Sequence, residues 1–386
     1  MKPGYKQTEV GVIPEEWEVK RLGEVASIAT GNTPPTSDAS NYGDEFPFVG
    51  PVDLGDAKFI SKTEKMLSKK GFAMSRRFPK NSILFVSIGS TIGKCGIAPV
   101  ELTSNQQINA IFPSTNFSTD FFYYAVSAAA PRIKAQAGEQ AVPIVNKTQF
   151  SETAVALPPL PEQRAIATAL SDVDALLAAL DRLITKKRDL KQAAMQQLLT
   201  GQTRLPGFKR QWETKRLGDL ASISKGAQLH SSQMDDAGNY AHLNGGITPS
   251  GYTHKSNTPA NTIAISEGGN SCGFVQFMTE AYWCGGHCYS VIPNAIDNRF
   301  LYHALKGKQP EIMSLRVGSG LPNVQKTALL GFTLPIPTDQ PEQTAIATVL
   351  SDMDAELATL EQRLVKTRAL KQGMMQELLT GRTRLV

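Results

Sequence analysis

Residues 161–205 read PEQRAIATALSDVDALLAALDRLITKKRDLKQAAMQQLLTGQTRL, and residues 341–385 read PEQTAIATVLSDMDAELATLEQRLVKTRALKQGMMQELLTGRTRL. Aligned without gaps, these segments share 29 identities in 45 positions. A shorter pair, WEVKRLG at 17–23 and WETKRLG at 212–218, opens each half of the chain. The sequence therefore alternates a variable block with a repeated segment, twice. Two similar heads on matching stems indicate a target that also has two halves.

Each repeated segment predicts one long helix, because its apolar residues alternate at spacings of three and four, as in a coiled-coil seam. The seam residues are Ile166, Leu170, Val173, Leu177, Leu180 and Ile184 in the first copy, and Ile346, Leu350, Met353, Leu357, Leu360 and Leu364 in the second. Further along, the pattern predicts a shift by one position, to Leu190, Ala194 and Leu198 and to Leu370, Met374 and Leu378.

The ends of the two predicted helices are also marked in the sequence. Pro161 and Pro341 suit a first helical position, and Gly201 and Gly381 suit a left-handed cap. About 40 residues at 1.5 Å each give a rod of roughly 60 Å. A core helix in a bundle is the alternative interpretation, but two near-identical stripes favour pairing with each other.

The variable blocks, residues 17–156 (the first head) and 212–333 (the second head), predict two domains of one α/β (α+β) fold. Buried strands are expected at 83–88, 108–112, 262–266 and 289–292, and helices near Thr119-Asp120 and Asp297-Asn298. The identical segments at Trp17 and Trp212 are predicted to anchor each head to a stem. The predicted domains are 1–156 and 206–333 for the heads, and 157–205 and 334–386 for the coiled-coil helices.

Composition sets only broad limits on function. The 386 residues carry a formal net charge of +5 and 41% hydrophobic residues, which is ordinary for a globular protein and slightly favours a polyanionic partner. The sequence has no apolar run of the ~18 to 20 residues that span a bilayer, and residues 1–6 lack a signal-peptide core. These features predict a cytoplasmic protein.

Four cysteines leave two alternatives open. Cys272, Cys284 and Cys288, with His287, have the residue types of a zinc site, although the first head has no counterpart and its one cysteine is Cys95. Buried reduced thiols are the other interpretation, and the one favoured.

The signatures of catalysis are not duplicated. All five histidines lie in the second variable block. Gly89–Cys95 resembles a phosphate loop, but it has one residue too few between its glycines and Cys95 in place of Ser or Thr. Asn32-Thr33-Pro34-Pro35 does not supply the motif of an amino-methyltransferase. We therefore predict a protein that recognises its target and has no active site of its own.

The order and duplication of these motifs resemble the DNA-specificity (S) subunit of type I restriction–modification systems. The resemblance rests on the PEQ helix starts, the LLTGxTRL helix ends and the opening Gly11-Val12-Ile13-Pro14-Glu15-Glu16-Trp17, and it covers nearly the whole chain. It implies two target-recognition domains, separated by two long antiparallel helices, that each read one half of a split double-stranded DNA sequence.

The resemblance also implies partners. Two adenine-methylating modification subunits and the translocating restriction subunits would bind this chain, and the methyl donor and ATP would bind only to them. The chain itself would carry no cofactor. A coiled-coil scaffold that binds only proteins is the alternative, but a scaffold has no reason to duplicate a fold while diversifying its loops.

Candidate DNA-contacting residues are polar or basic side chains in short loops beside the predicted strands, where base edges and phosphates could be reached. In the first head they are Arg76, Arg77, Lys80, Ser90, Thr91, Lys94, Asn105, Gln106 and Gln107. In the second head they are Asn270, Ser271, His287, Arg316, Asn323 and Gln325.

Inserting or deleting residues within one repeated helix is expected to change the number of unspecified bases between the half-sites. Both half-site sequences should stay the same, because the helices would set the spacing and the heads would read the bases. Adenine-methylation mapping of DNA from cells that carry the variant and its partners measures both quantities. An altered half-site would contradict this modular interpretation.

Overall fold

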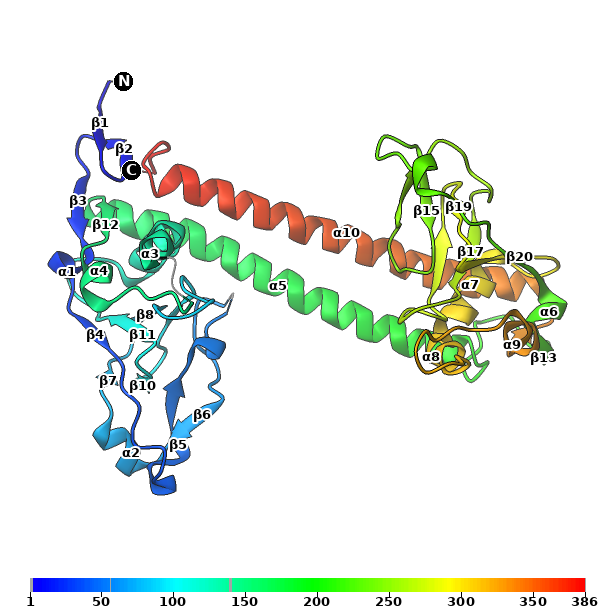
Figure 1. The fold of residues 1–386 in the computed structure, drawn as a ribbon, viewed down its shortest axis with the longest axis horizontal. Coiled ribbons are helices and arrows are strands. Elements are labelled where there is room, and N and C mark those ends of the chain that lie inside the picture. The colour runs from blue at the N-terminus through cyan, green and yellow to red at the C-terminus, as the bar shows by residue number, and fades with distance from the viewer. Residues whose placement is uncertain (1–2, 56, 139–140, 386) are drawn as a thin grey trace. The chain divides into compact units, whose positions relative to one another are not determined.

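Two long helices, α5 (Leu160–Leu198) and α10 (Gln340–Leu378), organise the fold in the computed structural model, which describes residues 3–55, 57–138 and 141–385 (Figure 1). The contacts divide the chain into unit 1, Met1–Ala179 with Leu364–Val386, and unit 2, Leu180–Arg363. Each unit thus holds one head and a part of both helices. The predicted outer domain limits, residues 1 and 386, lie outside the described residues.

The first head is built on two four-stranded sheets. The first sheet is antiparallel, in the order β4 (Ile28–Thr30), β11 (Ile108–Ile111), β8 (Ile83–Val86) and β9 (Cys95–Ile97). The second has the order β6 (Lys65–Leu67), β5 (Tyr42–Val49), β10 (Leu102–Ser104) and β7 (Arg77–Phe78), with β5 and β10 parallel. The helices are α1 (Leu22–Val25), α2 (Lys69–Met74), α3 (Thr119–Lys134) and α4 (Lys147–Ser151).

The second head repeats this plan. Its antiparallel sheet has the same order, β14 (Ala221–Lys225), β20 (Cys288–Pro293), β17 (Thr262–Ser266) and β18 (Val275–Met278). The other sheet is β16 (Gly251–Thr253), β15 (Tyr240–Leu243) and β19 (Trp283–Cys284), again with one parallel pair. The helices are α6 (Leu217–Leu220), α7 (Asn298–Gly307), α8 (Gln309–Ser314) and α9 (Lys326–Gly331). The predicted α/β heads of one fold are confirmed.

A short ladder joins the beginning and the end of each head. In the first head β3 (Glu18–Arg21) pairs with β12 (Ala154–Leu157), and a hairpin of β1 (Tyr5–Thr8) and β2 (Gly11–Pro14) precedes it. In the second head β13 (Trp212–Arg216) pairs with β21 (Thr333–Pro337). The predicted boundary after residue 156 falls within β12, and the boundary after residue 333 falls within β21.

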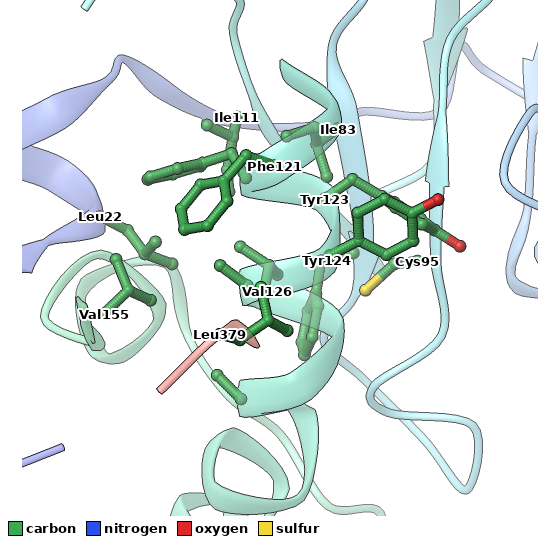
Figure 2. Close-up of a cluster of buried hydrophobic side chains, with 14 of the residues drawn as sticks. Leu22, Ile83, Cys95, Ile111, Phe121, Tyr123, Tyr124, Val126, Val155 and Leu379 are labelled. Carbon is green, nitrogen blue, oxygen red and sulfur yellow. The ribbon is translucent and has the colours of Figure 1, made fainter. Parts of the chain in front are cut away.

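The core of unit 1 includes both the head and the ends of the two helices. Alternate residues of β8 face opposite layers: Ile83 and Phe85 pack toward α3, and Leu84 and Val86 toward the second sheet. Figure 2 shows Phe121 and Val126 of α3 beside Leu22, Val155 and Leu379. The same cluster contains Ile166, Ala167, Leu170 and Leu378. Unit 2 has a corresponding cluster of α7, α5 and α10 residues.

The two helices run antiparallel within each unit, as the order of the residue pairs between them shows. In unit 1, Lys371 Nζ lies 2.6 Å from Asp174 Oδ1. In unit 2, the matching pair is Lys191 with Asp354. A further pair, without a counterpart among the described residues of unit 1, joins Lys187 Nζ to Glu356 Oε1 at 2.7 Å. Because position 174 repeats as 354 and position 191 as 371, the same contact is made in both units.

The predicted shift of the seam is wrong at its first residues. Leu190 and Leu370 are 47% and 58% exposed. The spacing between seam residues instead continues to alternate between three and four, through Lys187 and Lys191 in α5 and Lys371 in α10. A pattern of apolar residues does not reveal this, because these lysines occupy seam positions by pairing with acids of the opposite helix.

The PEQ motif at each helix start makes the same contacts in both units. The Glu162 carboxylate is fully buried and accepts bidentate hydrogen bonds from Arg384 at 2.5 and 2.8 Å. Glu342, equally buried, accepts two 2.6 Å bonds from Arg204. These contacts raise the pKa of Arg384.

The glutamine of the motif joins each head to its stem. Gln163 Oε1 accepts a hydrogen bond from Ser118 N, at the N-cap of α3, and Gln163 Nε2 donates to Pro158 O, just after β12. Gln343 makes the equivalent contacts with Asp297 N and Pro337 O. The helix start therefore holds both the helix cap and the closing strand of a head.

The predicted anchoring role of the first tryptophan is confirmed. Trp17 is fully buried and its Nε1 donates to Glu162 Oε2 at 2.9 Å. Gly381 has the expected left-handed φ of +69°, and a Cβ there would lie 3.1 Å from the Trp17 ring. Gly201, with φ of +71°, packs in the same way against Trp212.

A polar junction connects the main helix of each head to α5 or α10. In unit 1, Tyr124 Oη donates to Asp174 Oδ2 at 2.6 Å and lies 3.3 Å from Ser171 Oγ. In unit 2, His303 takes the place of the tyrosine, with Nε2 3.0 Å from Ser351 Oγ and Nδ1 3.9 Å from Asp354 Oδ2. Burial lowers the pKa of His303 to about 4.

Replacing Leu170 by alanine is expected to reduce the free energy of unfolding by about 2 to 5 kcal/mol, because Leu170 is fully buried. The matched control Leu190→Ala, in the same helix but exposed, should change it by less than about 0.5 kcal/mol. Denaturant titration followed by circular dichroism measures both. Equal losses would contradict the uninterrupted seam.

His303 also predicts a pH dependence. An unfolded histidine titrates near pH 6.5, so the unfolded chain binds more protons than the folded one between pH 6.5 and about 4. The free energy of unfolding should therefore fall as the pH falls through this range, by at most about 1.4 kcal/mol per pH unit from this group. His303→Gln cannot titrate, so its free energy of unfolding should depend less on pH there. Denaturant titrations at several pH values test this, and identical slopes in both proteins would contradict it.

Candidate nucleic-acid interface

Three loops meet at one edge of the antiparallel sheet in the first head. They are the turn after β8 (87–91), the turn before β11 (105–107) and the segment before α4 (143–145). Ser87 N donates to Gln107 O at 2.8 Å, Gly89 N to Pro143 O at 2.9 Å, and Val145 N back to Ser87 O at 2.8 Å. Backbone hydrogen bonds alone thus fix the three loops to each other.

The second head makes the same set of bonds. Glu267 N donates to His287 O at 2.9 Å, Gly269 N to Pro322 O at 3.0 Å, and Val324 N to Glu267 O at 2.8 Å. The corresponding segments are 267–271, 285–287 and 322–324.

A fourth loop joins each edge at a glycine. Gly31 N donates to Ile108 O, and Gly226 N donates to Cys288 O. A Cβ at Gly31 would lie 2.3 Å from Asn105 O, and one at Gly226 would lie 2.3 Å from Cys284 O, so only glycine permits this approach. We call the segments 31–33, 87–91, 105–107 and 143–145 the first loop edge, and 226–228, 267–271, 285–287 and 322–324 the second loop edge.

The first loop edge gathers most of the residues predicted in the first head. Ser90 and Thr91 lie in its β8 turn, which continues to Lys94, and Asn105, Gln106 and Gln107 form the turn before β11. Arg76 reaches the same edge, because its backbone N–H donates to Asn32 Oδ1 at 2.6 Å and its guanidinium to Thr30 O at 2.5 Å.

Two predicted residues lie away from this edge or face elsewhere. Lys80 follows β7, and the next residue, Asn81, bonds to Ala98, at the opposite end of β8 from the turn at 87–91. The guanidinium of Arg77 lies 5.0 Å from the centre of the Phe72 ring. The structure therefore does not bring Lys80 together with the other candidates.

The second loop edge contains Asn270, Ser271, His287 and Asn323. Gln325 follows the second loop edge directly and is the N-cap residue of α9. Arg316 precedes Val317, which forms a β-bridge with Asn323 of the same edge. A pocket of about 410 Å³ opens here, lined by Lys225, Glu267, His287, Tyr289, Asn323, Gln325, Lys326 and Thr327.

Glu267 is the electrostatic centre of this pocket. It accepts hydrogen bonds from Lys225 Nζ at 2.6 Å and Tyr289 Oη at 2.9 Å, and His287 Nδ1 lies 3.6 Å away. Burial and this carboxylate raise the pKa of Tyr289. The pocket thus combines charged and neutral groups that can meet base edges or phosphates.

Sequence reasoning missed the fourth loop of each edge and the acid at the centre of the pocket in the second head. The missed residues are Thr33, Gln228 and Glu267. The sequence does contain a signal for the fourth loop: Gly31 and Gly226 are separated by 195 positions, as are Trp17 and Trp212. That offset aligns Thr33 with Gln228.

The cysteines of the second head do not converge on His287. Cys272 packs in the main core, whereas Cys284 and Cys288 belong to a separate buried cluster. His287 is instead exposed and faces Glu267. Among the described residues, no three or more His, Cys, Asp or Glu side chains are grouped to hold a metal. In the first head, burial raises the pKa of Cys95 to about 12.

The segment Gly89–Cys95 is a turn between the antiparallel strands β8 and β9. A nucleotide phosphate loop leads instead from a strand into a helix, whose N-terminus faces the phosphates.

None of the described helices has the length and hydropathy of a bilayer span.

Comparison with protein families gives two matches in this chain to the type I restriction modification DNA specificity domain, over residues 14–188 and 209–367. The chain belongs to this family. Each match covers one head and most of the helix that follows, so the duplication in the sequence is a duplication of this domain. The predicted specificity-subunit resemblance is confirmed. The family is non-catalytic, which confirms the prediction that the chain is not itself an enzyme.

Several curated relatives are specificity subunits. A type I restriction enzyme specificity subunit of Methanocaldococcus jannaschii is 28% identical over 254 residues, covering 60% of this chain and 57% of that protein. A putative type I specificity subunit of Mycoplasma pneumoniae is 34% identical over 172 residues, covering 44% and 46%. The chain thus spans about half the length of these two relatives. A second Methanocaldococcus jannaschii specificity subunit is 24% identical, covering 97% and 94%.

Solved structures share the fold. The S subunit of a type I restriction–modification system from M. genitalium superposes with a TM-score of 0.70 at 20% identity, covering 98% of this chain and 99% of that one. A chain from a type I restriction–modification assembly gives a TM-score of 0.57 at 18% identity, covering 96% and 99%.

Proposed function

We propose that this protein is the specificity subunit of a type I restriction–modification complex and selects a bipartite double-stranded DNA sequence. Each head binds one half-site through its loop edge. Partner subunits then methylate adenine in the selected DNA, or cut it.

The observation that carries the proposal is the contrast between backbone and side chains at the loop edges. The same hydrogen bonds hold both edges, yet Ser87 corresponds to Glu267, and Gln107 corresponds to His287. Direct readout of bases depends on the donors and acceptors that side chains present. A constant frame with exchanged polar groups supports the reading of two different half-sites.

Affinity would come mainly from phosphate contacts, which carry no sequence information. Exposed Arg76 and Lys94 border the first loop edge, and Lys225 and Lys326 line the pocket at the second. The net charge of +5 agrees with a polyanionic partner.

The proposed partners follow from the family. Two modification methyltransferase subunits and restriction subunits with translocase and nuclease activity would assemble on this chain in the cytoplasm. The methyl donor and ATP would bind to those subunits, and this chain would need no cofactor. Adenine methylation requires the base to leave the helical stack, at a cost of a few kcal/mol. A subunit that holds the DNA through two half-sites helps to offset that cost.

Adenine-methylation mapping tests the proposal. DNA is taken from cells that carry the partner subunits with the wild-type chain, or with a chain whose first loop edge is altered by Ser90→Ala, Thr91→Ala and Asn105→Ala together. We expect a split motif that depends on the chain, with only one of its halves altered in the variant.

The control replaces three exposed stem residues, Gln196, Gln197 and Thr200, by alanine, and should leave both half-sites unchanged. Absence of any chain-dependent motif, with the partners shown to be present and bound, would contradict the proposed function.

A further inference from the structure

Two pairs of residues occupy equivalent backbone positions at the loop edges. Thr33 corresponds to Gln228, because each lies two residues after the glycine that bonds to β11 or β20. Gln106 corresponds to Gly286, because each is the middle residue of the turn that precedes those strands, and the turn is closed by Ile108 N bonding to Asn105 O or by Cys288 N bonding to Gly285 O.

The side chains of these pairs are exchanged between the heads. In the first head the short residue is Thr33 and the long one is Gln106. The Thr33 Oγ1 donates a hydrogen bond to Gln106 Oε1 at 2.8 Å. In the second head the long residue is Gln228, on the other loop, and it faces Gly286. A Cβ at Gly286 would lie 2.7 Å from Gln228 Oε1.

Gln228 therefore occupies the space that a side chain at 286 would enter, and it would have to move aside for a residue there. In the observed arrangement, one of the two facing loops supplies the carboxamide at this point in each head. Each head has one: Gln106 comes from the turn before β11, and Gln228 from the loop after β14. Both side chains are exposed at their loop edge, where they can reach a ligand.

We propose that Gln106 and Gln228 place the same carboxamide at the same point of the two loop edges, and that each reads an adenine at the equivalent position of its half-site. A glutamine amide presents one donor and one acceptor, which match N7 and the N6 amino group of adenine in the major groove. The inference rests on the proposed function and adds a common specificity-determining position, occupied from different loops.

The first test replaces Gln228 by alanine in the full chain with its partner subunits, followed by adenine-methylation mapping. The second half-site should lose its preference for adenine at one position by roughly ten- to hundredfold, and the first half-site should stay unchanged. Gln106→Ala should have the reciprocal effect. Gln362→Ala, an exposed glutamine on α10, is the control and should change neither half.

The second test moves the arrangement of the first head into the second, by Gln228→Thr together with Gly286→Gln. Gly286 does not have a left-handed φ, and the shorter residue at 228 frees the space that a side chain at 286 would enter, so the exchange is sterically possible. The wild-type second half-site should return, because the carboxamide arrives at the same point from the facing loop.

Either of two results would overturn the inference. One is an unchanged second half-site in Gln228→Ala. The other is a double exchange that leaves the half-site relaxed, gives it a different base or abolishes methylation. If Gln228→Ala abolished all methylation, recovery of the wild-type motif by the double exchange would still support the inference. A wild-type chain on which no motif depends would instead contradict the proposed function itself.

Discussion

A buried carboxylate at the start of each long helix is the constraint on which the rest of this structure depends. Glu162 and Glu342 are fully buried, and a buried charge without a partner is strongly unfavourable. The partner comes each time from just beyond the end of the other helix, as Arg384 or Arg204. The helix start and the returning chain must therefore meet within each unit, which requires the helices to run antiparallel there. The net gain in stability from such a pair is small, because the cost of desolvating two charges offsets most of their attraction.

The contact between the buried glutamate and its arginine also positions each head. Gln163 and Gln343, next to the buried acids, bind the cap of the main head helix and the end of the closing strand. Apolar residues from both helix ends then complete each head's core. The loop edges are held by backbone hydrogen bonds and by glycines that permit close approach, so their side chains can change without disturbing the frame. Exchange of the exposed side chains at the loop edges is thereby separated from the stability of the fold.

The sequence pattern predicted the elements well, because their causes are local. The four predicted strands, the helix starts at PEQ and the left-handed glycines after each helix were all placed correctly to within a few residues. The seam was predicted correctly only while it stayed apolar. At Leu190 and Leu370 the prediction was wrong, because Lys187, Lys191 and Lys371 occupy seam positions through ion pairs with acids more than 160 residues away in the chain. Pairing over that separation leaves no local signal.

By itself, the sequence determined the duplication, the class of fold, the family and the turns that hold most of the candidate residues, since repeats and periodicity can be read along a single chain. Only the tertiary structure decided which loops share an edge. It separated Lys80 from the other candidates, brought Gly31 and Gly226 against the neighbouring turns, and placed Gln228 against Gly286, the counterpart of Gln106. The physical reason is that a loop edge is assembled by backbone hydrogen bonds between segments far apart in the chain, and no local sequence pattern shows which segments will meet.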